Sequence, residues 1–124
     1  MVRSLGYTRV EVVITNPERI KSVQSVFLVD SGSWYTAVSP SLAEKIDLKT
    51  VMKTVLTLAD ERKVEVDLSP AYVRVMDREV ATLVAVLNVP KPLLGVETLE
   101  ALGLKLDPAT GRLEITRPYT TLLV

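Results

Sequence analysis

Alternation between apolar and polar positions predicts β-strands along most of this chain. Apolar and often β-branched residues recur at every second position, or form short runs, between groups of turn-forming residues. The predicted strands cover residues 8–15, 24–30, 36–38, 54–60, 63–68, 71–75 and 79–89. The first two flank the turn-like sequence NPERIKS, and DER and MDR separate later strands closely enough for hairpins.

A short helix is expected at about residues 40–46, directly after the third predicted strand. Ser39 can cap this helix with Pro40 at its first position, which is a favoured place for proline. Ser41 and Glu44 form an alternative capping box in the same segment. Both alternatives predict a helix here.

A second helix is expected after Gly95. Val96, Leu99 and Leu102 recur at three-residue spacing, and Gly103 follows as the expected C-cap. The next segment, KLDPATGRLEI at 105–115, predicts a hairpin with DPATG as its turn.

Length and composition favour one mostly-β domain over residues 1–124, with one or two short helices. A chain of 124 residues with 48% hydrophobic residues can bury one core. No uninterrupted apolar run reaches the ~18 residues expected of a membrane span. We find no linker, internal duplication or low-complexity segment.

Charge and residue usage narrow the chemistry further. Fifteen basic and fifteen acidic residues cancel without a basic cluster, which argues against a nucleic-acid partner. The absence of Cys and His excludes thiolate nucleophiles, Ser-His catalysis and the usual zinc sites, so no metal or cofactor is expected. The N-terminal sequence has no signal-peptide segment, which predicts a cytoplasmic protein without membrane attachment.

The stretch SVFLVDSGSWYTAV places Asp30, Ser31 and Gly32 directly after an apolar strand. These residue types are common turn formers, so an ordinary turn is one interpretation. A second strand ends in Leu93 and Leu94 and leads through a glycine into a helix. The two segments together favour a functional interpretation.

The chain resembles the retropepsin-like aspartic proteases in two segments, VDSGS and LLGVETLEALGL, and in the distance between them. The resemblance is strongest to the small single-domain bacterial and archaeal members. The resemblance extends to about residue 115. It implies a closed β-barrel or sandwich protomer, with the acid-protease fold completed by homodimerisation. The implied activity is endopeptidase cleavage of peptide or protein substrates.

The resemblance implies that Asp30 is the catalytic residue and that each subunit of a homodimer supplies one. Hydrolysis by this route needs a carboxylate as base toward water and a carboxylic acid toward the scissile carbonyl. Two adjoining carboxyls cannot both ionise and therefore share a proton, for which aspartic proteases are themselves the standard example. Ser31 would brace the paired loops, Gly32 would offer its carbonyl to substrate, and the tail 116–124 would supply dimer strands or form an edge strand or a disordered end.

The implied substrate-binding residues come from the two signatures and from a flap expected at 57–66. They are Ser33, Leu93, Leu94, Gly95, Ala59 and Asp60. Gly95 would let its strand pass close behind the catalytic loop. The chain departs from the retroviral pattern at two places. The flap tip lacks glycine, and Trp34 and Tyr35 occupy positions where retroviral enzymes have acidic residues. Each aromatic residue would line a substrate pocket or pack at a dimer edge.

Two other functions remain open on the sequence alone. The first is a retropepsin-fold module that dimerises and binds peptide without cleaving it, which the unusual flap would suit. The second is an unrelated small β-barrel that binds a ligand, in which the Asp30 turn is purely structural. Glu97 and Glu100 are interpreted as a solvated helix face.

Overall fold

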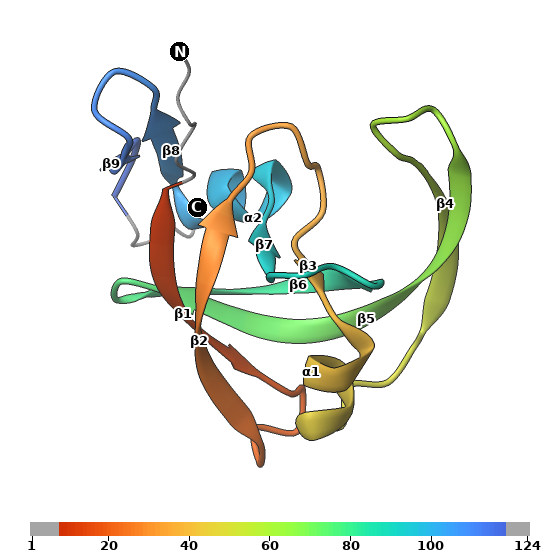
Figure 1. The fold of residues 1–124 in the computed structure, drawn as a ribbon. Coiled ribbons are helices and arrows are strands. Elements are labelled where there is room, and N and C mark those ends of the chain that lie inside the picture. The colour runs from red at the N-terminus through yellow and green to blue at the C-terminus, as the bar shows by residue number, and fades with distance from the viewer. Residues whose placement is uncertain (1–7, 119–124) are drawn as a thin grey trace, which may run out of the picture.

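The computed structural model describes residues 8–118, which are mostly β-strand (Figure 1). The strands are β1 Arg9–Thr15, β2 Ser22–Val29, β3 Ala37–Val38, β4 Met52–Thr57, β5 Lys63–Val75, β6 Arg78–Val86, β7 Leu93–Leu94, β8 Leu104–Asp107 and β9 Arg112–Ile115. The helices are α1 Pro40–Lys45 and α2 Val96–Leu102. The dimer strand expected in the tail falls mainly on residues 119–124, outside the described part of the chain.

The main sheet closes on itself to form a barrel. Its strand order is β1-β2-β7-β3-β6-β5-β4, and an additional pairing of β1 with β5 completes the ring. Most neighbours are antiparallel, whereas β2 pairs with β7 and β3 with β6 in parallel. Hairpin β4–β5 extends beyond the ring and rises, in Figure 1, across from the loop that follows β2. The expected mostly-β closed barrel with two short helices is confirmed.

One continuous strand, β5, replaces the two strands expected at 63–68 and 71–75. Ser69 and Pro70 stand between the two expected strands, and proline lacks the N–H that the interior of a paired strand uses. One edge of β5 pairs with β4 as far as Leu68 and with β1 from Tyr72 onward. Pro70 falls in the gap between these partners, where proline is tolerated.

Both helices form where their capping residues predicted. Ser39 is the N-cap of α1, and its Oγ accepts a hydrogen bond from the Leu42 N–H at 3.2 Å, so the first capping alternative is correct. Gly103 ends α2 in the left-handed conformation with φ 73°. Helix α2 packs against β6 and β8 and buries Leu99 and Leu102.

Two hydrophobic clusters stabilise the barrel. The larger fills the interior between β1, β2, β5, β6 and the helices, with Ile14, Phe27, Val73 and Leu94 fully buried. The smaller contains Ala37, Val66, Leu68 and Ala85, which come from β3, β5 and β6, and Leu56 of β4 packs against it. Within residues 8–118, no helix is long and apolar enough to cross a membrane.

Candidate active site

Asp30 follows the last residue of β2 and is held there by β7. Leu28 and Val29 pair in parallel with Leu93 and Leu94, and the Asp30 N–H donates to the Leu94 carbonyl at 3.0 Å. The apolar run therefore fixes the backbone on both sides of the acid, while its side chain stays half-buried at the end of the strand.

The residues after Asp30 form a tight turn around its carboxylate. The Gly32 N–H donates to Asp30 Oδ1 at 2.9 Å, and the Ser33 N–H donates to the Asp30 carbonyl at 3.1 Å. Within residues 8–118, no hydrogen bond is found to Asp30 Oδ2. The turn thus holds one carboxylate oxygen and leaves the other without a hydrogen-bond partner among the described residues.

Helix α2 anchors the rest of this loop by its first N–H groups. Val96 N–H donates to the Ser33 carbonyl at 2.8 Å, and Glu97 N–H donates to the Trp34 carbonyl at 3.0 Å. These N–H groups have no partner within the helix, so the loop carbonyls satisfy them. Ser33 Oγ also donates to the Tyr35 carbonyl at 2.7 Å, which leaves the loop few free polar atoms.

A buried pair of hydroxyls ties the same loop to the first turn of α2. Thr36 Oγ1 accepts from the Gly95 N–H at 3.0 Å and lies 2.6 Å from Thr98 Oγ1. Gly95 passes so close that an added Cβ would lie 2.4 Å from the carbonyl carbon and oxygen of Tyr35. Only glycine fits at this crossing.

Asp30 opens into a cleft of about 680 Å³ between this loop and hairpin β4–β5. The lining residues are Asp30, Gly32, Ser33, Trp34, Tyr35, Ala37, Leu56, Thr57, Leu58, Ala59, Ala85, Leu87, Val89 and Leu93. Among these residues, Asp30 is the only acidic or basic one. The cleft is therefore an apolar trough with one carboxylate, a composition typical of binding sites that also carry chemistry.

The structure brings five of the nine residues predicted for the site to this cleft: Asp30, Gly32, Ser33, Ala59 and Leu93. The other four lie elsewhere. Leu94 and Gly95 are buried behind the loop, where they support it. Ser31 is exposed outside the lining, and Asp60 is at the hairpin tip.

The hairpin tip is closed by local contacts. The Leu58 N–H donates to the Arg62 carbonyl at 2.8 Å, and Asp60 Oδ2 accepts from Arg62 Nε at 2.6 Å. Glu61 has a φ of 68°, a conformation that glycine adopts more easily. The tip without glycine is thus formed by an ion pair and one strained residue.

Sequence reasoning missed several apolar walls of the cleft. Leu56 precedes the expected flap, Ala85 lies within β6, and Leu87 and Val89 continue the alternation of β6 beyond its last residue. Their spacing of two residues was a usable signal, because alternate strand residues face the same side. The solvated face expected for Glu97 is wrong, since Glu97 is half-buried and its Oε1 accepts from Thr82 Oγ1 at 2.6 Å.

Carboxyl groups with a lowered pKa lie outside the cleft. A hydrogen bond with Lys21 lowers the pKa of Asp47, and one with Lys53 lowers that of Asp67. The backbone N–H of Ala109 lowers the pKa of Asp107 in the β8–β9 turn. These three groups stabilise surface contacts. Within residues 8–118, no group of three or more carboxylates is placed to bind a metal ion.

Comparison with solved structures identifies the fold. The chain is similar to an EIAV protease complexed with the inhibitor HBY-793, with a TM-score of 0.65 and 19% sequence identity. The match covers 86% of this chain and 98% of that chain. No protein-family model matches the sequence, and no curated protein matches it significantly. The retropepsin-like fold is thus confirmed, whereas the resemblance to the bacterial and archaeal members stays a prediction.

Proposed function

We propose that this chain is an aspartic endopeptidase that acts as a homodimer, with Asp30 from each copy at the shared centre. The observation that carries the proposal is the position of Asp30 as the single charged side chain of an apolar cleft, in a fold similar to a retroviral protease. No second carboxylate lines the cleft among the described residues. The second group that hydrolysis requires is therefore assigned to the partner copy.

The proposed reaction uses the two carboxyls in different protonation states. One carboxylate takes a proton from water as the water oxygen adds to the peptide carbonyl carbon, and the neutral carboxyl gives its proton to the carbonyl oxygen. Collapse of this tetrahedral diol breaks the C–N bond as one carboxyl gives its proton to the leaving amine and the other, now ionised, takes a proton from a diol hydroxyl. The Gly32 N–H, which bonds Asp30 Oδ1, orients the carboxylate for these steps.

The remaining residues of the two signatures have supporting roles in this proposal. Ser31 is exposed and in this proposal braces the loop against that of the partner copy, while Gly32 and Ser33, which line the cleft, border the substrate. Ala59 and the hairpin tip with Asp60 cover the bound peptide. A cytoplasmic location and action on peptide or protein without a cofactor belong to the same proposal.

Asp30→Asn tests the proposal directly. Wild-type protein should cleave members of a broad peptide library, read by mass spectrometry, whereas Asp30→Asn should form the same dimer by analytical ultracentrifugation without cleaving. Asp77→Asn, an exposed acid in the β5–β6 turn, is the matched control and should cleave normally. Adding excess Asp30→Asn to wild type should also reduce activity, because mixed dimers hold one carboxyl. Full cleavage by Asp30→Asn would refute the mechanism.

A peptide-binding module without hydrolysis is the second candidate. The observation in its favour is the hairpin tip, where the Asp60–Arg62 pair and the absence of glycine replace the glycine-rich tip of retroviral flaps. In that case wild type and Asp30→Asn would bind the same peptides and neither would cleave them.

A further inference from the structure

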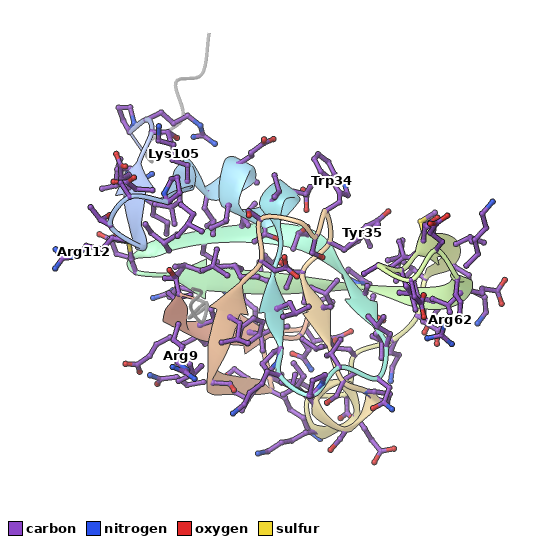
Figure 2. All side chains as sticks on the ribbon, turned by 45° about the horizontal axis from the view of Figure 1, so that its top comes forward. Arg9, Trp34, Tyr35, Arg62, Lys105 and Arg112 are labelled. Carbon is purple, nitrogen blue, oxygen red and sulfur yellow. The ribbon has the colours of Figure 1, made fainter. Side chains whose placement is uncertain are left out.

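The outer face of the barrel carries a second hollow, on strands β1, β2 and β5. Its volume is about 470 Å³, and its lining residues are Arg9, Val10, Glu11, Val13, Gln24, Arg74 and Met76. None of these seven residues is among those that line the cleft with Asp30. In Figure 2, Arg9 lies well apart from Trp34 and Tyr35, which border that cleft. We call this hollow the outer groove, and it is a surface separate from the candidate active site.

Strand β1 forms the middle of the outer groove, with β2 paired on one side of it and β5 on the other. Alternate residues of β1 are buried in the barrel, so Glu11 and Val13 face outward between them. Arg74 of β5 stands opposite Val13, four residues along β1 from Arg9. The two arginines are therefore about 13 Å apart along the strand direction. They mark the two ends of the groove.

Both arginines can accept an anionic partner. Arg9 is exposed, and within residues 8–118 no hydrogen bond or ion pair is found for its side chain. Arg74 is exposed too, and its Nε lies 3.8 Å from Glu79 Oε2, a long ion pair in which Glu79 also bonds Arg19. A guanidinium group binds a carboxylate through two parallel hydrogen bonds. Each end of the groove therefore favours a carboxylate.

Met76 supplies an apolar side chain midway between the two arginines. It follows the paired Val75 and comes level with Glu11, as the first residue of the two-residue turn between β5 and β6. Its φ is 60°, where glycine or asparagine is usual because a Cβ is strained. Met76 is nevertheless 58% exposed and adds little to the core. A large apolar side chain kept exposed at a strained position indicates a contact with a partner.

We propose that the outer groove binds an extended acidic segment of a partner protein. One carboxylate would pair with Arg9 and another with Arg74, and an apolar side chain between them would contact Val13 and Met76. In an extended chain, residues i, i+2 and i+4 face the same side, and residues i and i+4 are about 13 Å apart. The pattern that fits the groove is therefore Glu-x-Leu-x-Glu.

The middle of the groove restricts its occupant further. Glu11 faces outward there and is held by Gln24, whose Nε2 donates to Glu11 Oε1. This carboxylate would repel a third acid at i+2, which argues against a continuous polyanion such as a nucleic acid. Strands β2 and β5 are two strand spacings apart, about 9.6 Å, which is narrower than an α-helix with its side chains. An extended segment with separated acids fits better than either.

The experiment uses full-length, ¹⁵N-labelled Asp30→Asn, which would not consume a peptide. The blocked peptide Ser-Glu-Thr-Leu-Thr-Glu-Ser is added while the backbone amide shifts are followed by NMR. The largest shifts should lie at Glu11, Val13 and Arg74. Replacing both Glu residues of the peptide with Lys, or its Leu with Glu, should weaken binding about tenfold. Shifts centred on the cleft, or none at about 5 mM peptide, would overturn the inference.

Variants of the protein identify the groups responsible. Arg9→Gln and Arg74→Gln should each weaken binding about threefold, because each removes one exposed ion pair. Arg112→Gln is the matched control, since Arg112 is an exposed arginine of β9 outside the groove, and it should bind normally. Equal losses in Arg9→Gln and Arg112→Gln would show a general attraction between charges and overturn the inference.

Met76→Gly separates binding from stability. Glycine fits the positive φ of the turn, so Tm should not fall, whereas the peptide should bind about threefold more weakly because its apolar side chain loses a contact. A lower Tm with unchanged affinity would show that Met76 is structural and would overturn its role.

The inference goes beyond the proposed function and does not depend on it. Binding at the outer groove in a protein that cleaves no peptide would refute the endopeptidase and retain the groove. Cleavage that depends on Asp30, with no binding that depends on Arg9 and Arg74, would retain the endopeptidase and refute the groove.

Discussion

Gly95 lies directly against Tyr35, so that a Cβ on Gly95 would stand 2.4 Å from the Tyr35 carbonyl carbon and oxygen and 2.7 Å from the Trp34 carbonyl oxygen. These are backbone atoms, and the Trp34 carbonyl is already bonded to α2. Gly95→Ala should therefore lower the free energy of unfolding by about 3 kcal/mol or more, measured by urea denaturation.

Gly32→Ala is the matched glycine substitution in the same loop. Its Cβ would lie 3.3 Å from Asp30 Oδ1, a side-chain atom that can move by a few tenths of an ångström. Stability should change by less than about 1 kcal/mol, whereas any Asp30-dependent cleavage should fall, because the carboxylate is displaced. If Gly95→Ala proved as mild as Gly32→Ala, the close crossing would be wrong.

Arg78 connects the end of α2 to the residues that follow β9. Arg78 is 6% exposed, and its Nη1 donates to the carbonyls of Leu102 and Arg117, each at 2.9 Å. Arg78→Met should lower the free energy of unfolding by about 2–4 kcal/mol, because it leaves buried carbonyls without their charged donor. Arg112→Met, at an exposed position of β9, should change it by less than about 0.5 kcal/mol. Equal losses in the two variants would contradict this role.

Replacing Glu61 with glycine should relieve backbone strain at the hairpin tip. A side chain in the left-handed region costs about 1 kcal/mol, which glycine avoids, although glycine also gains freedom in the unfolded chain. Glu61→Gly should stabilise the hairpin by up to about 1 kcal/mol and slow hydrogen exchange of the Leu58 N–H, which bonds the Arg62 carbonyl. Glu61→Ala keeps the Cβ and should give no such gain. Faster exchange in the glycine variant would count against the strain.

The Lys53–Asp67 pair across β4 and β5 predicts a defined pH window. Its hydrogen bond lowers the pKa of Asp67 from the ordinary 3.8 and raises the pKa of Lys53 from the ordinary 10.5. The contribution of Asp67 is present above pH 3.8 and is lost as the pH falls through its lowered pKa. The contribution of Lys53 is present below pH 10.5 and is lost as the pH rises through its raised pKa.

Asp67→Asn should therefore lower Tm mainly between about pH 4 and pH 10.5, with the difference from wild type shrinking outside this range. The pair is exposed, so the difference should be a few degrees at most. Thermal unfolding at pH 2 to 11 measures it, and Asp77→Asn is the control. A difference that stays constant over this range would exclude the ion pair as its source.

The sequence predicted those parts of the fold that depend on near neighbours. Ser39 and Gly103 cap helices through contacts within a few residues, and the strand alternation depends only on which side chains are apolar. The continuity of β5 was missed, because a proline within it is tolerated only where β4 and β1 leave its edge unpaired, which local sequence does not contain.

In the candidate site, too, the residues held by local contacts were predictable and those brought together by distant segments were not. Asp30 and Gly32 were predictable because their turn is local, and its hydrogen bonds span two and three residues. Leu56 and Leu87 were missed, since two-residue spacing tells which strand residues share a face but not whether that face lines a core or a cleft. The hydrogen bond between Glu97 and Thr82 likewise joins segments that only the closed barrel brings together.

The two-residue strand β7 also determines when the loop bearing Asp30 can take its final shape during synthesis. Leu93 and Leu94 pair with β2, and Leu93 also pairs with β3, so the loop bearing Asp30 is closed at both ends by residues translated much later. A nascent chain that has exposed β1 to β6 contains Asp30 but lacks the segment that fixes it. Because such long-range pairing forms late, the growing polypeptide holds no finished cleft until α2 has left the ribosome.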